Sequence, residues 1–274
     1  MHDVPETPKT SAPTQRNIVL RVEGLGVTFQ SFGRPDFEAL AGIDLQLFDR
    51  EIVGIVGESG SGKTTLGRCI AGFLQPTIGT IRARGEGESL RSEKPRSIGR
   101  AGVQMVFQEA STSLNPRLPL WRSVAEALTK GRSTGRAHKS AAVAELVRVG
   151  LTPAQAIKLP SEVSGGQRQR AGIARALASG AEVLVCDEAV ASLDVSVRSK
   201  VLNLLLDLRE TRGTSILFIS HDMGIVAHLA DRLIVMKDGR IVEAGPTQQV
   251  IGDPRHDYTK ALLAAVPSLE RGLS

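Results

Sequence analysis

The sequence predicts an α/β fold in which helices cover a mainly parallel sheet. Three observations predict it. Short apolar segments of strand character alternate with helical segments through most of the chain. Residues 43–47 alternate apolar and polar, as a half-buried strand of an antiparallel sheet does. The stretch from about 109 to 163 lacks strand patterns. We therefore expect a parallel core, an antiparallel β portion and an all-helical insertion.

The first part of the chain supplies most of the expected strands. Residues 52–56 (IVGIV) are almost continuously apolar, which is typical of a strand buried on both faces. Residues 33–37 form a turn-rich loop, and the polar stretch 82–100, with charges of both signs, is interpreted as a surface loop or short hairpin. The remaining expected elements are strands at 18–27, 43–47 and 102–108 and a helix at 63–71.

The second part of the chain alternates helices with short buried strands. Its last expected element is a hairpin at 233–243, because Asp238-Gly239 is a strong two-residue turn signal. The other expected elements are helical segments within 120–149, 166–178, 195–209 and 225–229 and strands at 183–186 and 216–219.

The composition is that of an ordinary globular chain. Its 274 residues are 41% hydrophobic and 23% charged, and the net charge of +5 slightly favours anionic partners. No basic stretch is interleaved with aromatic residues, so we expect no nucleic-acid partner. No apolar run approaches the roughly 18 residues that span a bilayer. The polar segment 1–17 is expected to be a disordered arm.

Two cysteines, Cys69 and Cys186, lie inside apolar segments. A disulfide framework or a cysteine-based metal site is therefore not expected. Two reduced, buried thiols suit the cytosol.

The clearest motif is residues 57–64, GESGSGKT, which fit the phosphate-loop pattern G-x-x-x-x-G-K-[ST] between a strand and a helix. Glycines let backbone N–H groups approach a polyphosphate, and the helix that follows presents its positive end to the phosphates. Lys63 is expected to neutralise the β- and γ-phosphate oxygens of ATP, and the Thr64 hydroxyl to ligate Mg²⁺. The expected nucleotide contacts are Gly57, Glu58, Ser59, Gly60, Ser61, Gly62, Lys63, Thr64 and Thr65.

A second candidate site is the pair Asp187-Glu188, which ends the apolar segment 183–186. The carboxyl ends of strands are where open α/β sheets bind ligands. We interpret Asp187 as a Mg²⁺ ligand and Glu188 as the general base that activates the attacking water. Without the phosphate loop, a strand followed by a solvated turn would be the better explanation of the pair.

Residues 163–170, VSGGQRQR, decide the family. Ser164 is expected to cap a helix, and Gly165 and Gly166 to expose backbone N–H groups to an anion. With Gln167, this segment resembles the signature motif of ABC ATPases. The resemblance extends over about 18–269 and implies a RecA-like P-loop core with an antiparallel β subdomain and a helical subdomain at about 109–163.

The resemblance assigns roles to further residues. Gln108 resembles the Q-loop glutamine that senses Mg²⁺ and the membrane partner, Asp194 the D-loop aspartate that faces the other subunit, and His221 the switch histidine of the γ-phosphate. Phe29 is the candidate for stacking on adenine, with Phe32 and Phe37 as competitors.

Two stretches resemble the oligopeptide/dipeptide/nickel importer subfamily. They are Ser113–Arg117 (SLNPR) and the tail Asp253–Leu263 with Pro267, where Asp257 replaces the usual proline. Ala189-Val190 after Glu188 departs from the usual Pro-Thr or Pro-Val and resembles nickel-type relatives, so a metal or metallophore cargo stays open. The chain ends without the cysteines of an iron–sulfur tail, and we expect no cluster.

The resemblance implies an ATP-hydrolysing subunit of an importer on the cytoplasmic face of a membrane. Its implied partners are a second ATPase subunit, identical or paralogous, the transmembrane permeases and an extracytoplasmic substrate-binding protein. The alternatives are a non-transport complex such as phosphonate lyase and a soluble ABC ATPase of DNA repair or translation. The expected domains are the arm 1–17, the ATPase domain 18–250 and the subfamily tail 251–274.

Overall fold

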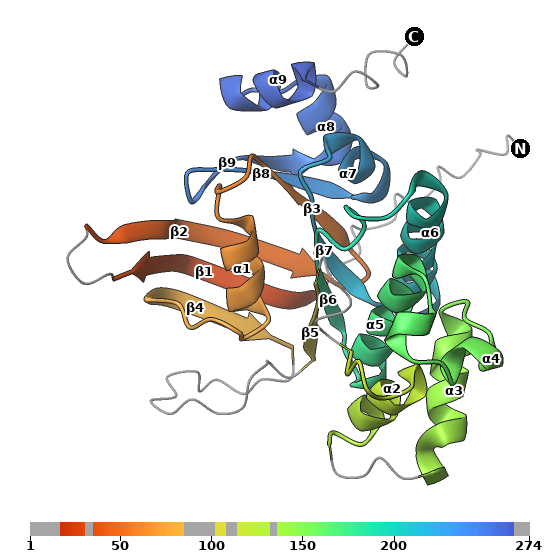
Figure 1. Ribbon diagram of the computed structural model, residues 1–274. Coiled ribbons are helices and arrows are strands. Elements are labelled where there is room, and N and C mark those ends of the chain that lie inside the picture. The colour runs from red at the N-terminus through yellow and green to blue at the C-terminus, as the bar shows by residue number, and fades with distance from the viewer. Residues whose placement is uncertain (1–16, 31–34, 85–101, 108–113, 132–135, 266–274) are drawn as a thin grey trace, which may run out of the picture.

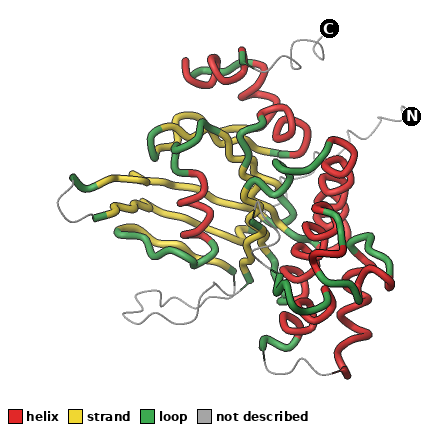
Figure 2. Tube along the Cα trace, in the orientation of Figure 1, coloured by secondary structure: helices red, strands yellow, loops and turns green. Residues whose placement is uncertain are grey.

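The computed structural model describes residues 17–30, 35–84, 102–107, 114–131 and 136–265. These residues form a three-stranded antiparallel sheet, a six-stranded sheet and a group of helices on the far side of the larger sheet (Figures 1 and 2). The expected α/β class with an antiparallel portion is confirmed. Almost the whole expected arm, 1–16, lies outside the described residues.

The three-stranded sheet has the order β2-β1-β4, with β1 paired to both neighbours in antiparallel fashion. Its strands are β1 (Ile18–Phe29), β2 (Phe37–Phe48) and β4 (Ile78–Ala83). We did not expect β4, which begins at Ile78 and takes up Arg82 and Ala83 from the stretch interpreted as a surface loop or short hairpin. The strand lies at the sheet edge and leaves most of its residues exposed, so the sequence IGTIRA carries little apolar alternation.

The six-stranded sheet has the order β5-β6-β7-β3-β8-β9. All neighbouring pairs are parallel except β8–β9, which is the expected hairpin. Asp238 and Gly239 both have positive φ, 47° and 73°, as a two-residue turn of this kind requires. The strands are β3 (Ile52–Val56), β5 (Val103–Val106), β6 (Val183–Asp187), β7 (Ser215–Ile219), β8 (Arg232–Lys237) and β9 (Arg240–Pro246).

The two faces of the larger sheet bury different helices. Along β3, Val53 and Ile55 join the core that includes helix α1 (Lys63–Ile70), whereas Ile52 and Val56 join the core of the opposite face. That opposite face carries α5 (Gly165–Ala178) and its neighbours, and Figure 1 shows α1 and α5 on either side of the sheet. Helices α6 (Val195–Arg212) and α7 (Met223–Leu229) also lie on the α5 side.

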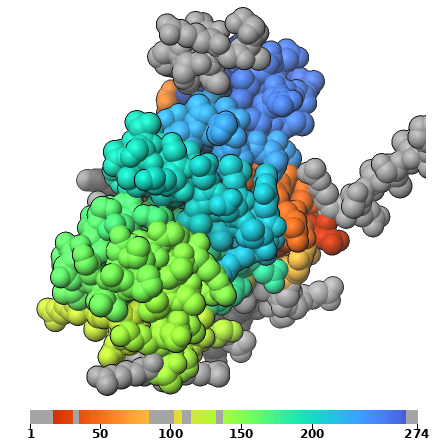
Figure 3. Space-filling view, turned by 90° about the vertical axis from the view of Figure 1, so that its right-hand side faces the viewer, coloured from red at the N-terminus to blue at the C-terminus, as the bar shows by residue number. Residues whose placement is uncertain are grey.

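The described part of 114–163 contains helices and no strand, as expected for the insertion. Figure 3 faces this region: α6, in teal, runs between the green helical region and the blue elements near the C-terminus. The region's helices are α2 (Leu120–Leu128), α3 (Lys139–Arg148), α4 (Pro153–Ala156) and the 3₁₀ turns η2 (Arg136–His138) and η3 (Pro160–Glu162).

Two short helices complete the chain, α8 (Thr247–Gly252) and α9 (Asp257–Ala264). The expected boundary between the ATPase domain and the tail, at 250/251, falls inside α8. Asp257 is the first residue of α9, where proline and acidic side chains are both favourable, so the replacement of proline in the tail motif suits this position. Among the described residues, no helix has the length and apolar character needed to cross a membrane.

Both cysteines are fully buried, and they lie in the cores on opposite faces of the larger sheet. Burial, with the nearby charge of Asp187, raises the pKa of the Cys186 thiol to about 12. We therefore predict that iodoacetamide at pH 8 modifies neither cysteine in the folded protein, because the thiolate is the reactive form. Mass spectrometry after labelling in urea should find both alkylated, and labelling of Cys186 in the folded chain would contradict the prediction.

Candidate functional site

The candidate residues gather at the carboxyl edge of three adjacent parallel strands, β6, β7 and β3. The phosphate loop follows β3, Asp187 ends β6 with Glu188 directly after it, and His221 follows β7. Asp187 pairs with Ile219 across β6 and β7, so the residues that follow these strands are neighbours. The sheet topology therefore assembles three segments that are far apart in the sequence at one edge.

The phosphate loop has positive φ at Gly57, Gly60 and Gly62, and at the first and last of these a side chain would also collide with neighbouring backbone. Gly57 and Gly62 have φ of 153° and 98°. A Cβ at Gly57 would lie 2.2 Å from the carbonyl oxygen of Met236, and one at Gly62 would lie 2.8 Å from that of Ala39. The loop is therefore fitted between the β8–β9 turn and β2, while Glu58, Ser59 and Gly60 remain exposed.

Lys63 folds over this loop. Its ammonium Nζ donates hydrogen bonds to the carbonyl oxygens of Gly57, at 2.8 Å, and Glu58, at 2.7 Å, and to Ser61 Oγ at 3.2 Å. Burial lowers the pKa of Lys63, although the carboxylates around it, Glu188 foremost, act in the opposite direction. If phosphate bound here, the Lys63 ammonium could donate to anionic phosphate oxygens in place of its neutral carbonyl and hydroxyl partners, and such charge-assisted hydrogen bonds are stronger.

Thr64 and Asp187 meet next to the loop. The Thr64 hydroxyl donates to Asp187 Oδ1 at 3.1 Å. Burial raises the pKa of Asp187, and the hydrogen bond from Thr64 partly offsets this. A hydroxyl and a carboxylate are oxygen ligands of the kind Mg²⁺ takes, and a cation would compensate the cost of burying the carboxylate. Thr65 lies half-buried in the first turn of α1.

Two side chains alone do not complete a metal site. Among the described residues, no group of three or more His, Cys, Asp and Glu side chains could hold a metal ion. The pair fits Mg²⁺ in the way that phosphate-bound Mg²⁺ is usually held, with few protein ligands and the rest from water and phosphate.

Glu188 and His221 form the third part of the site. His221 Nδ1 lies 3.2 Å from Glu188 Oε1, and the side chain of Glu188 remains 25% exposed. Glu188 has a φ of 48°, unusual for a residue other than glycine, and its N–H donates to the carbonyl of Ile219 at 3.0 Å. Such strained backbone is concentrated at functional sites. A carboxylate that is accessible and oriented by an imidazole can accept a proton from water.

The turn after Glu188 forms without the usual proline. The N–H of Ala191 donates to the Glu188 carbonyl at 3.0 Å, and Ala189 and Val190 are buried. A backbone hydrogen bond thus closes this turn in the absence of proline.

The signature segment forms the expected helix cap. Ser164 Oγ accepts from the Gln167 N–H at 3.3 Å, and the Gln167 side chain accepts from the Ser164 N–H at 2.9 Å. Packing adds a further requirement at one of the two glycines. Gly165 is partly open, but Gly166 is buried, and a Cβ there would lie 1.9 Å from Val197 Cγ1 of α6. The missing side chain of Gly166 is thus required by the packing of α5 on α6.

Asp194 caps α6 rather than standing free. Its Oδ1 accepts from the Val197 N–H and the Ser196 hydroxyl, both at 2.9 Å, and these bonds lower the pKa of the carboxyl. Contact of the exposed Asp194 with a second subunit stays a prediction.

The adenine-stacking candidates lie on the three-stranded sheet. Phe29, the last residue of β1, and Phe37, the first residue of β2, are cross-strand partners. Both residues are exposed, by 44% and 61%. Either ring is accessible to a base. Phe32, Gln108, Ser113 and Pro267 lie outside the described residues, so the roles expected for them stay predictions.

Sequence reasoning missed one residue at the phosphate loop. The hydroxyl oxygen of Tyr258, in α9, accepts a hydrogen bond from the Glu58 N–H at 2.9 Å. The available signal was that the chain's single tyrosine lies inside the tail motif.

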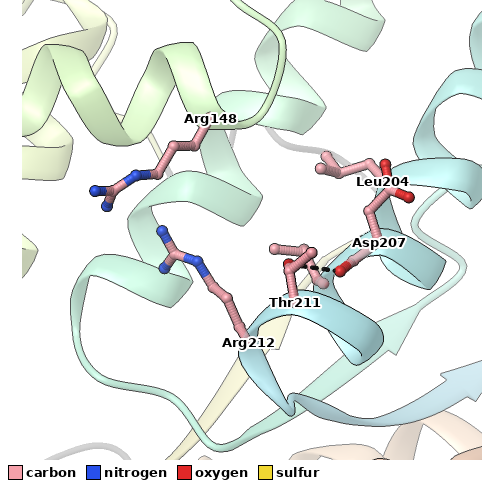
Figure 4. Close-up of a pocket in the computed structure, with 6 residues that line it drawn as sticks. Arg148, Leu204, Asp207, Thr211 and Arg212 are labelled. Atoms are coloured by element: carbon pink, nitrogen blue, oxygen red, sulfur yellow. Dashed lines mark hydrogen bonds between the residues drawn. The ribbon is translucent and has the colours of Figure 1, made fainter.

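A hollow of about 620 Å³ lies away from this edge, between α3 and α6 (Figure 4). The guanidinium groups of Arg148 and Arg212 lie near each other at one side of it, away from Leu204 and Asp207. Both pair with Glu145, and the Arg212 Nη2 distance to Glu145 Oε2 is 2.6 Å. Glu145 pairs with both cations, and the carboxylate of Asp207 also lines the hollow, so the hollow is not a candidate anion site. Its lining residues are Arg148, Leu204, Asp207, Leu208, Thr211 and Arg212.

Comparisons with known proteins agree with this geometry. Residues 40–191 match the family model described as ABC transporter, and residues 242–274 match the oligopeptide/dipeptide transporter C-terminal region. The chain is 44% identical over 236 residues to the probable D,D-dipeptide transport ATP-binding protein DdpF of Escherichia coli, covering 86% of this chain and 72% of that protein. It is 41% identical to the oligopeptide transport ATP-binding protein OppF of Lactococcus lactis, covering 85% and 73%.

Solved structures of ATP-binding cassettes share the fold. CbiO1 from Clostridium perfringens, described as part of the ABC transporter complex CbiONQ, aligns with a TM-score of 0.74 at 27% identity, covering 86% of this chain and 92% of that one. The cassette MJ0796, described as a dimer in a post-hydrolysis state with ADP and Pi, aligns with a TM-score of 0.73 at 28% identity, covering 83% and 98%. The chain therefore belongs to the ABC transporter family of ATP-binding proteins and has the ABC ATPase fold.

Proposed function

We propose that this chain is the ATP-hydrolysing subunit of a membrane importer for peptides. The observation that carries the catalytic part is the contact of Glu188 with His221 beside the Thr64–Asp187 pair. In this proposal Lys63 and the backbone of the phosphate loop bind the phosphates, Glu188 accepts the proton of the attacking water, and His221 orients Glu188. Thr64, Asp187 and Gln108 would hold Mg²⁺, which when bound neutralises phosphate charge.

A complete site needs a second ATPase subunit. The phosphate loop precedes α1 and the Ser164 cap begins α5, and these helices pack on opposite faces of the larger sheet. Within one chain, therefore, the two elements do not face each other across one nucleotide. We infer that residues 164–167 of a partner subunit close over the phosphates, and the dimeric state described for MJ0796 supports this arrangement.

The C-terminal region supports a peptide cargo. Residues 242–274 match the oligopeptide/dipeptide transporter region, and the relatives DdpF and OppF are named for dipeptide and oligopeptide transport. The phosphonate-lyase alternative finds no support among the relatives. A nickel or metallophore cargo rests on Ala189-Val190 alone. The proposed partners are transmembrane permeases and an extracytoplasmic binding protein, with this chain on the cytoplasmic face.

Reconstitution tests the proposal. The chain is assembled in proteoliposomes with the permeases and binding protein encoded beside it, and phosphate release is measured. We expect a peptide-loaded binding protein to stimulate ATP hydrolysis above the level seen with the same protein unloaded, while Ni²⁺ has no such effect. Native mass spectrometry of the complex then gives the number and identity of its ATPase subunits. Hydrolysis that ignores peptide, or that responds only to Ni²⁺, would show that the assigned cargo is wrong.

A further inference from the structure

The tail of the chain contacts the phosphate loop through a single side chain. Tyr258 lies 200 residues after Glu58, yet its hydroxyl oxygen accepts the Glu58 N–H at 2.9 Å. The side chain of Tyr258 is buried, with 9% exposed, although Glu58 itself is exposed. The contact therefore involves the backbone of the loop and not the side chain of Glu58.

The bond to Tyr258 acts on the same peptide unit that holds Lys63. The carbonyl of Gly57 and the N–H of Glu58 are the two ends of one planar peptide group. Lys63 Nζ donates to the carbonyl end at 2.8 Å, and Tyr258 accepts from the N–H end. Rotation of this peptide would break both bonds together. Each bond also polarises the peptide and strengthens the other.

Polar contacts fix Tyr258 in place. Glu243, in β9, accepts the backbone N–H groups of Arg255 at 2.8 Å and His256 at 3.1 Å. His256 Nδ1 in turn accepts the Tyr258 N–H at 3.1 Å and caps α9. The ammonium of Lys237 lies 4.9 Å from the centre of the tyrosine ring, within the range of a cation–π contact. These contacts fix the position of the Tyr258 ring next to the phosphate loop.

We propose that Tyr258 is a positioning residue for nucleotide binding, whose hydroxyl holds the 57–58 peptide in the orientation that the phosphates require. When phosphate oxygens take over Lys63, the hold of Lys63 on the Gly57 carbonyl weakens and the Tyr258 bond remains. The tail thus holds the phosphate loop in its binding conformation before nucleotide arrives. Nucleotide binding in turn changes the surroundings of the Tyr258 ring. This inference rests on the nucleotide site proposed above.

The first test removes only the hydroxyl. In the full-length chain, Tyr258→Phe keeps the ring, and we expect the affinity for MgADP to fall about three- to tenfold, the usual share of one hydrogen bond. The matched control is Lys260→Ala, on the same helix, where Lys260 pairs with the exposed Asp257 and its loss leaves affinity unchanged.

A second variant covers the case in which Tyr258→Phe does not fold. Glu243→Ala removes the acceptor that holds residues 255 and 256, and should lower MgADP affinity in the same direction. Unchanged affinity in a folded Tyr258→Phe chain, even with a lower melting temperature, means a purely structural contact and overturns the inference.

The single tyrosine of the chain allows a direct readout. Labelling with 3-fluorotyrosine places one ¹⁹F nucleus in the protein, and MgADP should shift its resonance, reversibly, while Mg²⁺ alone does not. A resonance that stays unchanged at saturating MgADP overturns the inference. If the unaltered protein does not bind MgADP at all, the proposed nucleotide site itself is wrong. If the unaltered protein and the Tyr258→Phe variant bind MgADP equally well, only the role of Tyr258 is wrong.

Discussion

Replacement of Glu188 by Gln lowers ATP hydrolysis by about 10²- to 10⁴-fold, the usual contribution of a general base. Gln keeps the size and shape of the side chain, so the turn at residues 188–191 and the contact with His221 have no steric reason to change. The negative charge is lost, and with it the ability to accept a proton. The phosphates still meet Lys63 and the phosphate loop, so nucleotide stays bound and the closed dimer accumulates.

Phosphate release at saturating ATP gives the rate, and size-exclusion chromatography with light scattering detects the dimer. The matched control is Glu182→Gln, the same chemical change just before the other end of β6, where the side chain is exposed and near-normal turnover is expected. If Glu188→Gln hydrolyses ATP at the rate of this control, Glu188 is not the base. A low rate without nucleotide retention would instead assign Glu188 to binding.

Replacement of Gly166 by Ala destabilises the protein by about 1–3 kcal/mol, the usual cost of overpacking a closely packed interior. The added Cβ would lie 1.9 Å from Val197 Cγ1, and valine has little rotamer freedom with which to move aside. Helix α5 must therefore shift away from α6. Since α5 begins at the Ser164 cap, we expect the signature segment to shift with it and ATP hydrolysis to fall.

The neighbouring glycine supplies the control. A Cβ at Gly165 meets its nearest atoms at 3.7 and 3.9 Å, which is ordinary contact. Gly165→Ala should therefore keep or slightly raise the melting temperature, because alanine is the better helix former. Adding Val197→Ala to Gly166→Ala removes the clashing methyl groups, and a double-mutant cycle in urea should show a favourable coupling. Equal stability of the two single variants would mean that Gly166 does not fix the approach of α5 to α6.

Much of this protein can be predicted from local sequence. The phosphate loop, the strand that ends in Asp187-Glu188 and the Ser164–Gln167 cap each depend on residues within a few positions of one another. Their backbone and hydrogen-bond requirements limit which residue types can stand at each position, so the pattern reveals the structure. The apolar alternation of the buried strands predicts them for the same reason. The exposed edge strand β4 buries too few side chains to leave such a pattern and was missed.

The sequence by itself determined the class of fold, the phosphate loop and the order of the catalytic segments, because these follow from short-range spacing and apolar periodicity. Only the tertiary structure decided that Glu188 contacts His221, that Val197 leaves no room for a side chain at position 166, and that Tyr258 accepts a hydrogen bond from the Glu58 N–H. These contacts join residues 31 to 200 positions apart. They depend on the order of the strands and on how the helices pack on them, and no local spacing encodes either.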